Sequence, residues 1–68
     1  MNTNKKIDFI WDTLDRMENG SYVGVSIGYI TDQIAWLWKF RKIDLKTMED
    51  MTALARYVIG IMGSKLYD

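Results

Sequence analysis

The stretch that decides the fold of this chain is residues 45–66, with the sequence LKTMEDMTALARYVIGIMGSKL. Apolar or small residues recur in it at alternating steps of three and four, which is the spacing of one face of a helix. This face, here called the heptad row, consists of Leu45, Met48, Thr52, Ala55, Ile59, Met62 and Leu66. A row of this kind predicts a long helix with an apolar seam of the heptad type, which Met51 and Val58 widen.

Residues that start and stop a helix lie at both ends of this stretch. Asp44 precedes it and can act as an N-cap by accepting a hydrogen bond from the backbone of the first turn. Gly60 and Gly63 weaken the last turns, because each glycine inside a helix costs up to about 1 kcal/mol relative to alanine. The helix is therefore predicted to cover about residues 45–63 and to end near Gly63.

A second helix is predicted near the N-terminus, over about residues 4–19. Its apolar stripe, again at steps of three and four, consists of Ile7, Ile10, Trp11, Leu14 and Met17. Thr3 or Asn4 can cap its first turn. Asn19 and Gly20 form the stop signal, because glycine readily takes the left-handed conformation that closes many helices.

The middle of the chain carries two competing patterns. Residues 23–29 alternate between large apolar side chains and glycine or serine, which is the period of a strand. A helical stripe begins inside the same segment and consists of Ile27, Ile30, Ile34, Leu37 and Trp38. The helical pattern is the longer one, so we expect a helix over about residues 26–42, capped by Ser26 or Thr31, after an extended segment at 22–25.

The fold predicted for residues 1–68 is therefore a single all-α domain of three helices packed as a small bundle. A chain of this length buries only about 60% of its unfolded surface, so its own core gives marginal stability. Small proteins usually add a disulfide, a metal or a partner chain. The sequence contains no Cys and no His, which excludes disulfides and removes the commonest metal ligands. A partner chain remains, and we expect a homodimer or small homo-oligomer.

Surplus apolar side chains also predict self-association. Hydrophobic residues make up 49% of the chain, and two of the predicted helices carry a second apolar strip. The first of these strips is formed by Tyr29, Trp36 and Phe40, and the other by Leu54, Tyr57 and Ile61. A helix in a three-helix monomer buries about one stripe, and exposed apolar patches normally mark interfaces. We therefore predict that these residues contact another chain.

The sequence offers no constellation that indicates catalysis. Without Cys and His, the familiar nucleophile–base arrangements are absent. Asp8, Asp12 and Asp15 face the same solvent, and nothing beside them suggests the apolar pocket that raises the pKa of one carboxyl group. These acids also lack the loop geometry of a calcium site, and no glycine-rich phosphate loop is present. We expect no enzyme activity, no metal and no cofactor.

Charge balance and hydropathy bear on partners and location. Nine basic and nine acidic residues give a formal net charge of zero, which argues against a non-specific nucleic-acid coat and against a polybasic membrane anchor. Residues 22–38 come nearest to a membrane span, but polar residues including Asp32 and Gln33 interrupt them. No stretch has the pattern of a signal peptide. We expect no membrane association and, by default, a cytoplasmic location.

Nucleic-acid binding is the alternative function. Aromatic and basic residues interleave in residues 36–42, WLWKFRK, and such mixtures can stack bases and neutralise phosphates. A basic cluster at the predicted turn after this helix comprises Lys39, Arg41, Lys42 and Lys46, the first three of them in the last turn of the predicted helix. An extended segment before two helices also has the order of a ribbon-helix-helix DNA-binding dimer. Its base-reading face would hold Gly24, Ser26 and Gly28 without Arg or Lys, so this interpretation is less favoured.

Small size, the missing catalytic residue types and the second apolar strips favour a regulatory protein that acts through protein–protein contact. These features are expected of a small inhibitor or accessory factor, such as mobile elements often encode. Within the predicted bundle we assign Leu14, Ile34 and Ile59 to the core, where replacement by alanine costs about 2–5 kcal/mol. Trp38 is assigned to the same core, and Trp36 to an interface.

Overall fold

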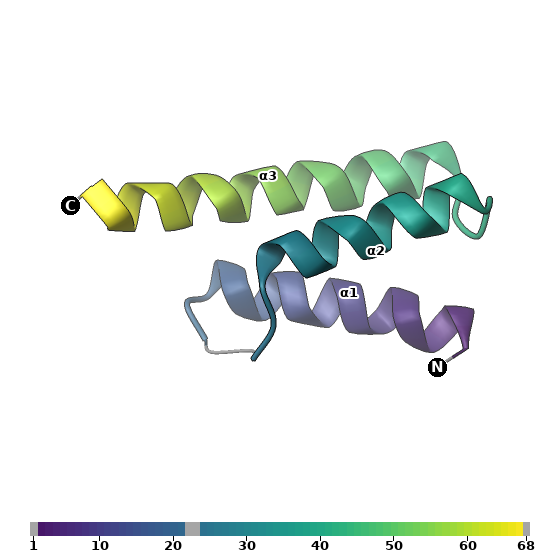
Figure 1. Ribbon diagram of the computed structural model, residues 1–68, viewed down its shortest axis with the longest axis horizontal. Helices are drawn as coiled ribbons and strands as arrows, with labels where there is room; N and C mark the ends of the chain where they lie inside the picture. Colours follow the sequence, from purple (N-terminus) through teal and green to yellow (C-terminus); the bar gives the residue numbers. More distant parts are fainter. Residues whose placement is uncertain (1, 22–23, 68) are drawn as a thin grey trace.

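Three helices make up the fold, as the sequence predicts (Figure 1). The computed structural model describes residues 2–21 and 24–67, with side chains for residues 2–21 and 24–62. The helices are α1 (Thr3–Glu18), α2 (Ile27–Lys39) and α3 (Leu45–Tyr67). α2 runs in the opposite direction to α1 and α3, and the C-terminal end of α3 extends beyond both other helices (Figure 1). Among the described residues, no helix has both the length and the apolar character needed to cross a bilayer.

Local hydrogen bonds explain where α1 begins and ends. Its N-cap is Asn2, whose side-chain Oδ1 accepts a 2.8 Å hydrogen bond from the backbone N–H of Lys5, so the predicted caps Thr3 and Asn4 are wrong. The reason is that Asn2 still has extended backbone angles, whereas Thr3 is already helical. The predicted stop is confirmed: Gly20 has a φ of 82°, which glycine adopts without steric cost.

The start of α2 settles the competition between strand and helix. Ser26 is the N-cap, and its hydroxyl accepts a 3.1 Å hydrogen bond from the backbone N–H of Tyr29. Gly24 has a φ of 74°, and residues 24–25 form a bend, so this part of the segment is not a strand. The extended conformation predicted for residues 22–23 lies outside the described residues. Ile27 begins the helix, and residues 24–26 are therefore the capping region of α2 rather than part of a ribbon.

The end of α2 comes three residues earlier than predicted. The helix stops at Lys39, and Arg41 takes a left-handed φ of 56°. The backbone N–H of Lys42 then donates to the carbonyl of Leu37 over 2.8 Å, which closes the turn. This reversal carries Ile43 into the core, where it is buried. Arg41 and Lys42 consequently lie in the turn, and not in the last turn of a helix.

α3 begins as predicted and ends later than predicted. The backbone N–H of Thr47 donates a 2.8 Å hydrogen bond to Asp44, which confirms the predicted N-cap. Hydrogen bonding from the side chain and backbone of Thr47 lowers the pKa of the Asp44 carboxyl group. The helix continues through Gly60 to Tyr67, so the predicted end near Gly63 is wrong. A glycine costs only about 1 kcal/mol in a helix, which is too little to end one whose other residues favour it.

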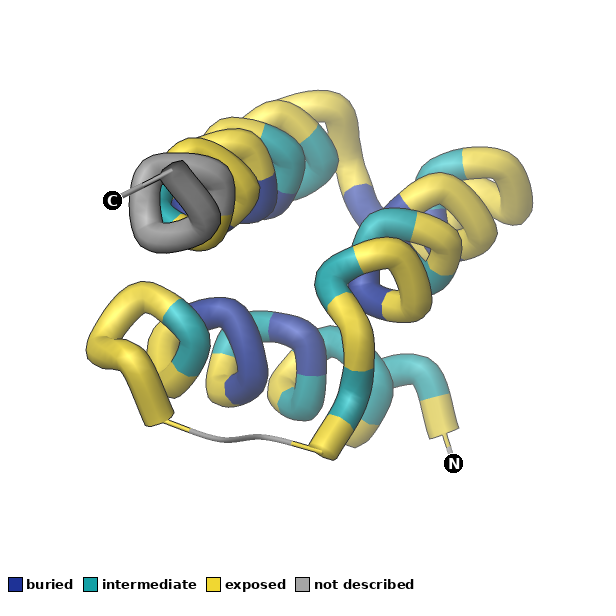
Figure 2. Tube along the Cα trace, turned by 60° about the vertical axis from the view of Figure 1, so that its left-hand side comes forward, coloured by how far each residue is buried: buried dark blue, intermediate teal, exposed yellow. Residues whose placement is uncertain are grey.

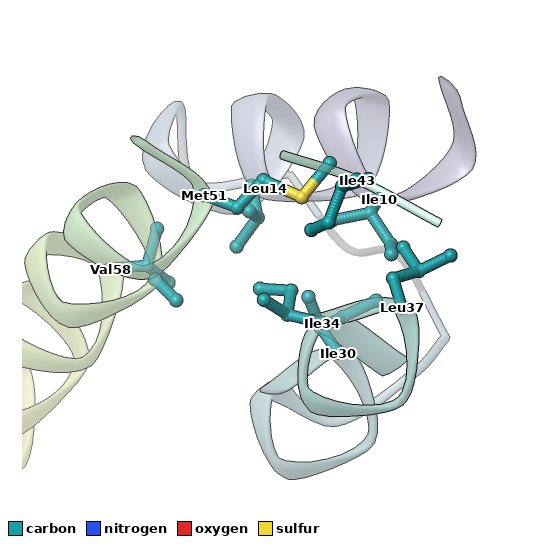
Figure 3. Close-up of a cluster of buried hydrophobic side chains, with 9 residues drawn as sticks. Ile10, Leu14, Ile30, Ile34, Leu37, Ile43, Met51 and Val58 are labelled. Carbon is teal, nitrogen blue, oxygen red and sulfur yellow. The ribbon is translucent and has the colours of Figure 1, made fainter. Parts of the chain in front are cut away.

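The three helices surround one apolar core. They lie at the corners of a triangle, with their buried residues turned toward its centre (Figure 2). The core consists of Ile10, Leu14, Ile30, Ile34, Leu37, Ile43, Met51, Ala55 and Val58. Most of these side chains converge in Figure 3 from all three helices. The core stripes predicted for α1 and α2 are confirmed in their central residues, Ile10 and Leu14 in α1 and Ile30, Ile34 and Leu37 in α2.

In α3 the buried row differs from the heptad row. Met51, Ala55 and Val58 are almost completely buried, whereas Ile59 retains 47% of its exposed surface, so its assignment to the core is wrong. α3 must face α1 and α2 at once, and both contact it. Its buried face is therefore centred between those two helices. The members of the heptad row from Met48 to Ile59, which share only Ala55 with this face, border α2 instead.

Alanine substitutions should reveal which row is buried. We expect Leu14→Ala and Ile34→Ala each to lower the free energy of unfolding by about 2–5 kcal/mol, because they open cavities in a packed core. Val58→Ala should cost more than Ile59→Ala, although it removes fewer carbon atoms, and Ile59→Ala should cost less than about 1 kcal/mol. Urea melts followed by circular dichroism, at concentrations low enough for the chain to be monomeric, would measure these differences. A larger loss for Ile59→Ala than for Val58→Ala would contradict this burial pattern.

The Asp44 cap predicts a specific pH dependence. Its folded-state pKa is lowered, so the charged carboxylate contributes stability above about pH 4 that is lost as the pH falls through the lowered value. Asn also caps helices but does not titrate. We expect the wild type to be more stable than Asp44→Asn at pH 7, and the two melting temperatures to converge at pH 2–3. A constant difference across this range would contradict a charged cap.

Candidate protein-binding surfaces

Two exposed surfaces lie on opposite sides of α2. The first, here called the aromatic strip, consists of Tyr29, Trp36 and Phe40, the residues predicted from the sequence to contact another chain. Trp36 and Phe40 are four residues apart, and their ring centroids are separated by 5.1 Å at an interplanar angle of 46°. They remain 39% and 52% exposed. The pair therefore presents a preformed, partly rigid apolar surface to solvent.

Helix α1 borders the aromatic strip. The Lys6 Nζ lies 4.0 Å from the centre of a Trp36 ring, a distance at which a cation is attracted to the ring face. A shallow cavity of about 240 Å³ between α1 and α2 is lined by Lys6, Phe9, Tyr29 and Gln33. The contributions of Lys6 and Phe9 were not predicted, because no local pattern tells which side of α1 faces α2.

The second surface is an apolar groove between α2 and α3, here called the α2–α3 groove. Its volume is about 370 Å³. The residues that line it are Thr31, Ile34, Ala35, Trp38, Met48, Thr52, Ala55, Arg56 and Ile59. Arg56 is the one charged residue among them, so the groove offers its occupant almost entirely apolar contacts.

The α2–α3 groove explains the position of the heptad row. Four of its members, Met48, Thr52, Ala55 and Ile59, line the groove. Of these four, Ala55 also belongs to the core, and Met48 packs against it. Trp38, assigned to the core from the sequence, is partly exposed and forms part of the opposite wall. Arg41 lies over its ring, with Cζ 4.3 Å from the centroid. The α2 wall could have been found from Thr31, Ala35 and Trp38, which are spaced at four and three residues.

The second predicted strip does not form one surface. Leu54 packs against the core, and Ile61 is partly buried. Tyr57 is the exposed member of this strip. It belongs neither to the aromatic strip nor to the α2–α3 groove. Its contact with another chain stays a prediction, and Leu54 already has an intramolecular role.

Most of the predicted basic cluster contacts its own chain. The Lys39 Nζ lies 5.7 Å from the centre of the Phe40 ring, and Arg41 lies over Trp38. The Lys46 Nζ is 2.8 Å from Asp50 Oδ1, and hydrogen bonding to that carboxylate raises the pKa of Lys46. Lys42 is exposed in the turn. Lys39, Arg41 and Lys46 are therefore each in contact with an aromatic ring or a carboxylate of the same chain.

The acidic residues do not assemble into a metal site in the part of the chain that the structure describes. Asp12 instead pairs with Arg16 one turn further along α1, with a 3.1 Å distance between Oδ2 and Nε. Both side chains are well exposed, and exposed pairs of this kind contribute little to stability. In the comparisons with known proteins, the chain matches no family model, no curated protein and no solved structure.

Replacing each tryptophan of α2 should distinguish the two surfaces. We expect Trp36→Ala to leave helicity intact and to cost less than about 1.5 kcal/mol, since it loses mainly a ring contact with Phe40 and the cation contact with Lys6. Trp38→Ala should cost more, about 2–3 kcal/mol, because it removes a partly buried wall of the groove. Thermal melts by circular dichroism would measure both. Equal losses would mean that both rings have the same structural role.

Proposed function

We propose that this protein is a non-catalytic binding protein that self-associates and regulates another protein by direct contact. The observation that carries the proposal is the apolar surface on both exposed sides of α2. Besides its core face, α2 carries the aromatic strip on one side and a wall of the α2–α3 groove on the other. A monomer of this size buries one such face per helix, and contiguous exposed apolar patches usually mark binding sites.

The chemistry of the aromatic strip favours a protein target. Tryptophan and tyrosine are enriched at binding hot spots, because they combine a large apolar area with one polar group. Trp36 is already held by Phe40 and Lys6, so little side-chain entropy is lost when a partner covers it. The cations Lys6 and Lys39 lie beside these rings. We propose an apolar target segment flanked by acidic groups.

The absence of the usual catalytic side chains supports a role without chemistry. The sequence contains neither His nor Cys, so the commonest general base and the commonest thiol nucleophile are missing. The remaining action of such a small chain is to occupy a surface of its target. Small size and the lack of these side chains support the role of an inhibitor or accessory factor. This is the regulatory role that we propose.

Capture of a target by the tagged protein tests this function. We expect a protein to be retained by the wild type and lost with Trp36→Ala or Phe40→Ala. Tyr57→Ala is the matched control, because Tyr57 is equally exposed but lies outside the aromatic strip. Retention should persist in high salt, whereas nucleic acid held through phosphates would be released steeply as salt rises. Release by salt, or equal loss with Tyr57→Ala, would contradict a target site at the aromatic strip.

Self-association predicts a mass above that of one chain. Sedimentation equilibrium at micromolar concentration should give at least twice 8.0 kDa, because the exposed apolar side chains include residues on both α2 and α3. The mass should fall toward that of one chain on dilution. A single 8.0 kDa species at all concentrations would contradict self-association, while leaving the capture experiment unaffected.

A further inference from the structure

We infer that a second copy of this chain covers the α2–α3 groove, with the two α3 helices packed antiparallel along their heptad rows. This inference rests on the self-association proposed above, and it adds the surface, the direction and the register. It also leaves the aromatic strip free, so that a dimer can bind its target on the other side of α2.

The heptad row has the pattern of a helix that packs against another helix, but among its described side chains the fold fully buries only Ala55. Its members alternate at three and four residues from Leu45 to Met62. Leu45, Ile59 and Met62 are 52%, 47% and 44% exposed. The intramolecular core uses a neighbouring row instead, that of Met51, Ala55 and Val58. α3 therefore carries two adjacent apolar rows, one filled by α1 and α2 and one open along the groove.

An antiparallel partner fits this row in one register. In antiparallel helix pairs, the first apolar position of a heptad on one helix faces the fourth position on the other. Here that places Leu45 beside Met62 of the second copy and Met48 beside Ile59 of the second copy. Thr52 and Ala55 then meet near the two-fold axis, where their small side chains allow the helices to approach closely. On the α2 wall, Thr31, Ala35 and Trp38 would border the incoming helix.

Charge complementarity supports the same register. Glu49 and Arg56 each follow the fourth position of a heptad, after Met48 and Ala55, and so lie along the same flank of the row. Glu49 and Arg56 are both exposed. The ion pairs among the described side chains, Asp12–Arg16 and Lys46–Asp50, include neither of them. Antiparallel packing brings Glu49 of each copy close to Arg56 of the other, which forms two symmetric pairs. Parallel packing would instead place like charges at the same height.

The surface area of the chain also fits a dimer. A folded monomer of 8.0 kDa is expected to expose about 4,450 Å², whereas this chain exposes 4854 Å². A standard interface buries about 800 Å² on each partner. The C-terminal end of α3 projects past α1 and α2 (Figure 1). In the antiparallel dimer this projecting end, with Met62, lies against the start of α3 in the second copy.

Disulfide crosslinking tests direction and register directly, because the chain has no cysteine of its own. Leu45→Cys and Met62→Cys are made as two separate single-cysteine proteins, mixed and mildly oxidised. We expect a crosslinked dimer in the mixture and little in either protein alone, since positions 45 and 62 on one helix are about 25 Å apart along its axis. Strong crosslinking of each variant with itself, with no mixed 45–62 species in the mixture, would overturn the antiparallel arrangement.

Charge reversal tests the flanking pairs. Glu49→Arg and Arg56→Glu, each alone, should weaken the dimer roughly tenfold, because each replaces two attractive contacts by repulsive ones. The double variant exchanges the charges and should restore the dimer to within about threefold of the wild type. Dissociation constants come from sedimentation, with circular dichroism confirming that each variant is folded. A double variant as weak as the single ones would overturn the register.

One further pair of variants separates this inference from self-association itself. Ile59→Asp places a charge in the groove, and Tyr57→Asp is the matched control on the other side of the same helix. We expect dimer loss with Ile59→Asp and retention with Tyr57→Asp. If the wild type is a dimer that survives Ile59→Asp but is lost with Tyr57→Asp or Trp36→Ala, self-association stands and the groove assignment is wrong. If the wild type is monomeric throughout, both are wrong.

Discussion

The structure depends on the burial of one row of α3 between the other two helices. Met51, Ala55 and Val58 are almost completely buried there, against Ile10 and Leu14 of α1 and the apolar stripe of α2. Successive residues of a helix are about 100° apart, so burial of this row sets the rotation of α3 about its axis. That rotation turns Ile59 and Thr52 toward the α2–α3 groove, and it turns Leu54 the other way, against the core. The position of the α2–α3 groove follows from this one packing choice.

The small size of the chain explains why these surfaces exist. Sixty-eight residues in three helices form a core only one layer of side chains deep, and chains of this size gain little stability from their core alone. The sequence nevertheless supplies more large apolar residues than this core can hold. They accumulate on α2 and α3, which together provide the walls of the groove. Association is the physical outcome that would remove this apolar area from water.

Electrostatic contacts on the surface fix the orientation of side chains more than they add to the stability of the fold. Lys6, Lys39 and Arg41 lie over the rings of Trp36, Phe40 and Trp38 respectively. Such contacts at exposed sites are worth about 0.5–1 kcal/mol each, so their main effect is to restrict where the rings and cations point. The aromatic strip consequently has a fixed apolar centre with cations at its edges.

The sequence by itself determined the number and type of the helices and about half of their ends. Hydrophobic periodicity, the caps at Ser26 and Asp44 and the stop at Asn19–Gly20 are local signals, which depend only on residues a few positions apart. The second apolar strip of α2 was also visible, because Trp36 and Phe40 fall outside the predicted stripe that ends in Trp38. The local pattern predicted two helix ends wrongly. α2 ends three residues earlier than predicted, with Ile43 buried after the turn, and α3 continues through Gly60 to Tyr67.

Only the tertiary structure decided which apolar row of α3 is core. The heptad row and the buried row are adjacent, share Ala55 and have the same spacing, so periodicity cannot distinguish them. The choice depends on where α1 and α2 lie relative to α3, and those positions are set by contacts between residues far apart in the sequence. The same long-range contacts placed Lys6 over Trp36 and opened the α2–α3 groove beside Trp38. The sequence pattern specifies which apolar faces each helix has. The packing of the three helices against one another specifies which of these faces is left exposed for a partner.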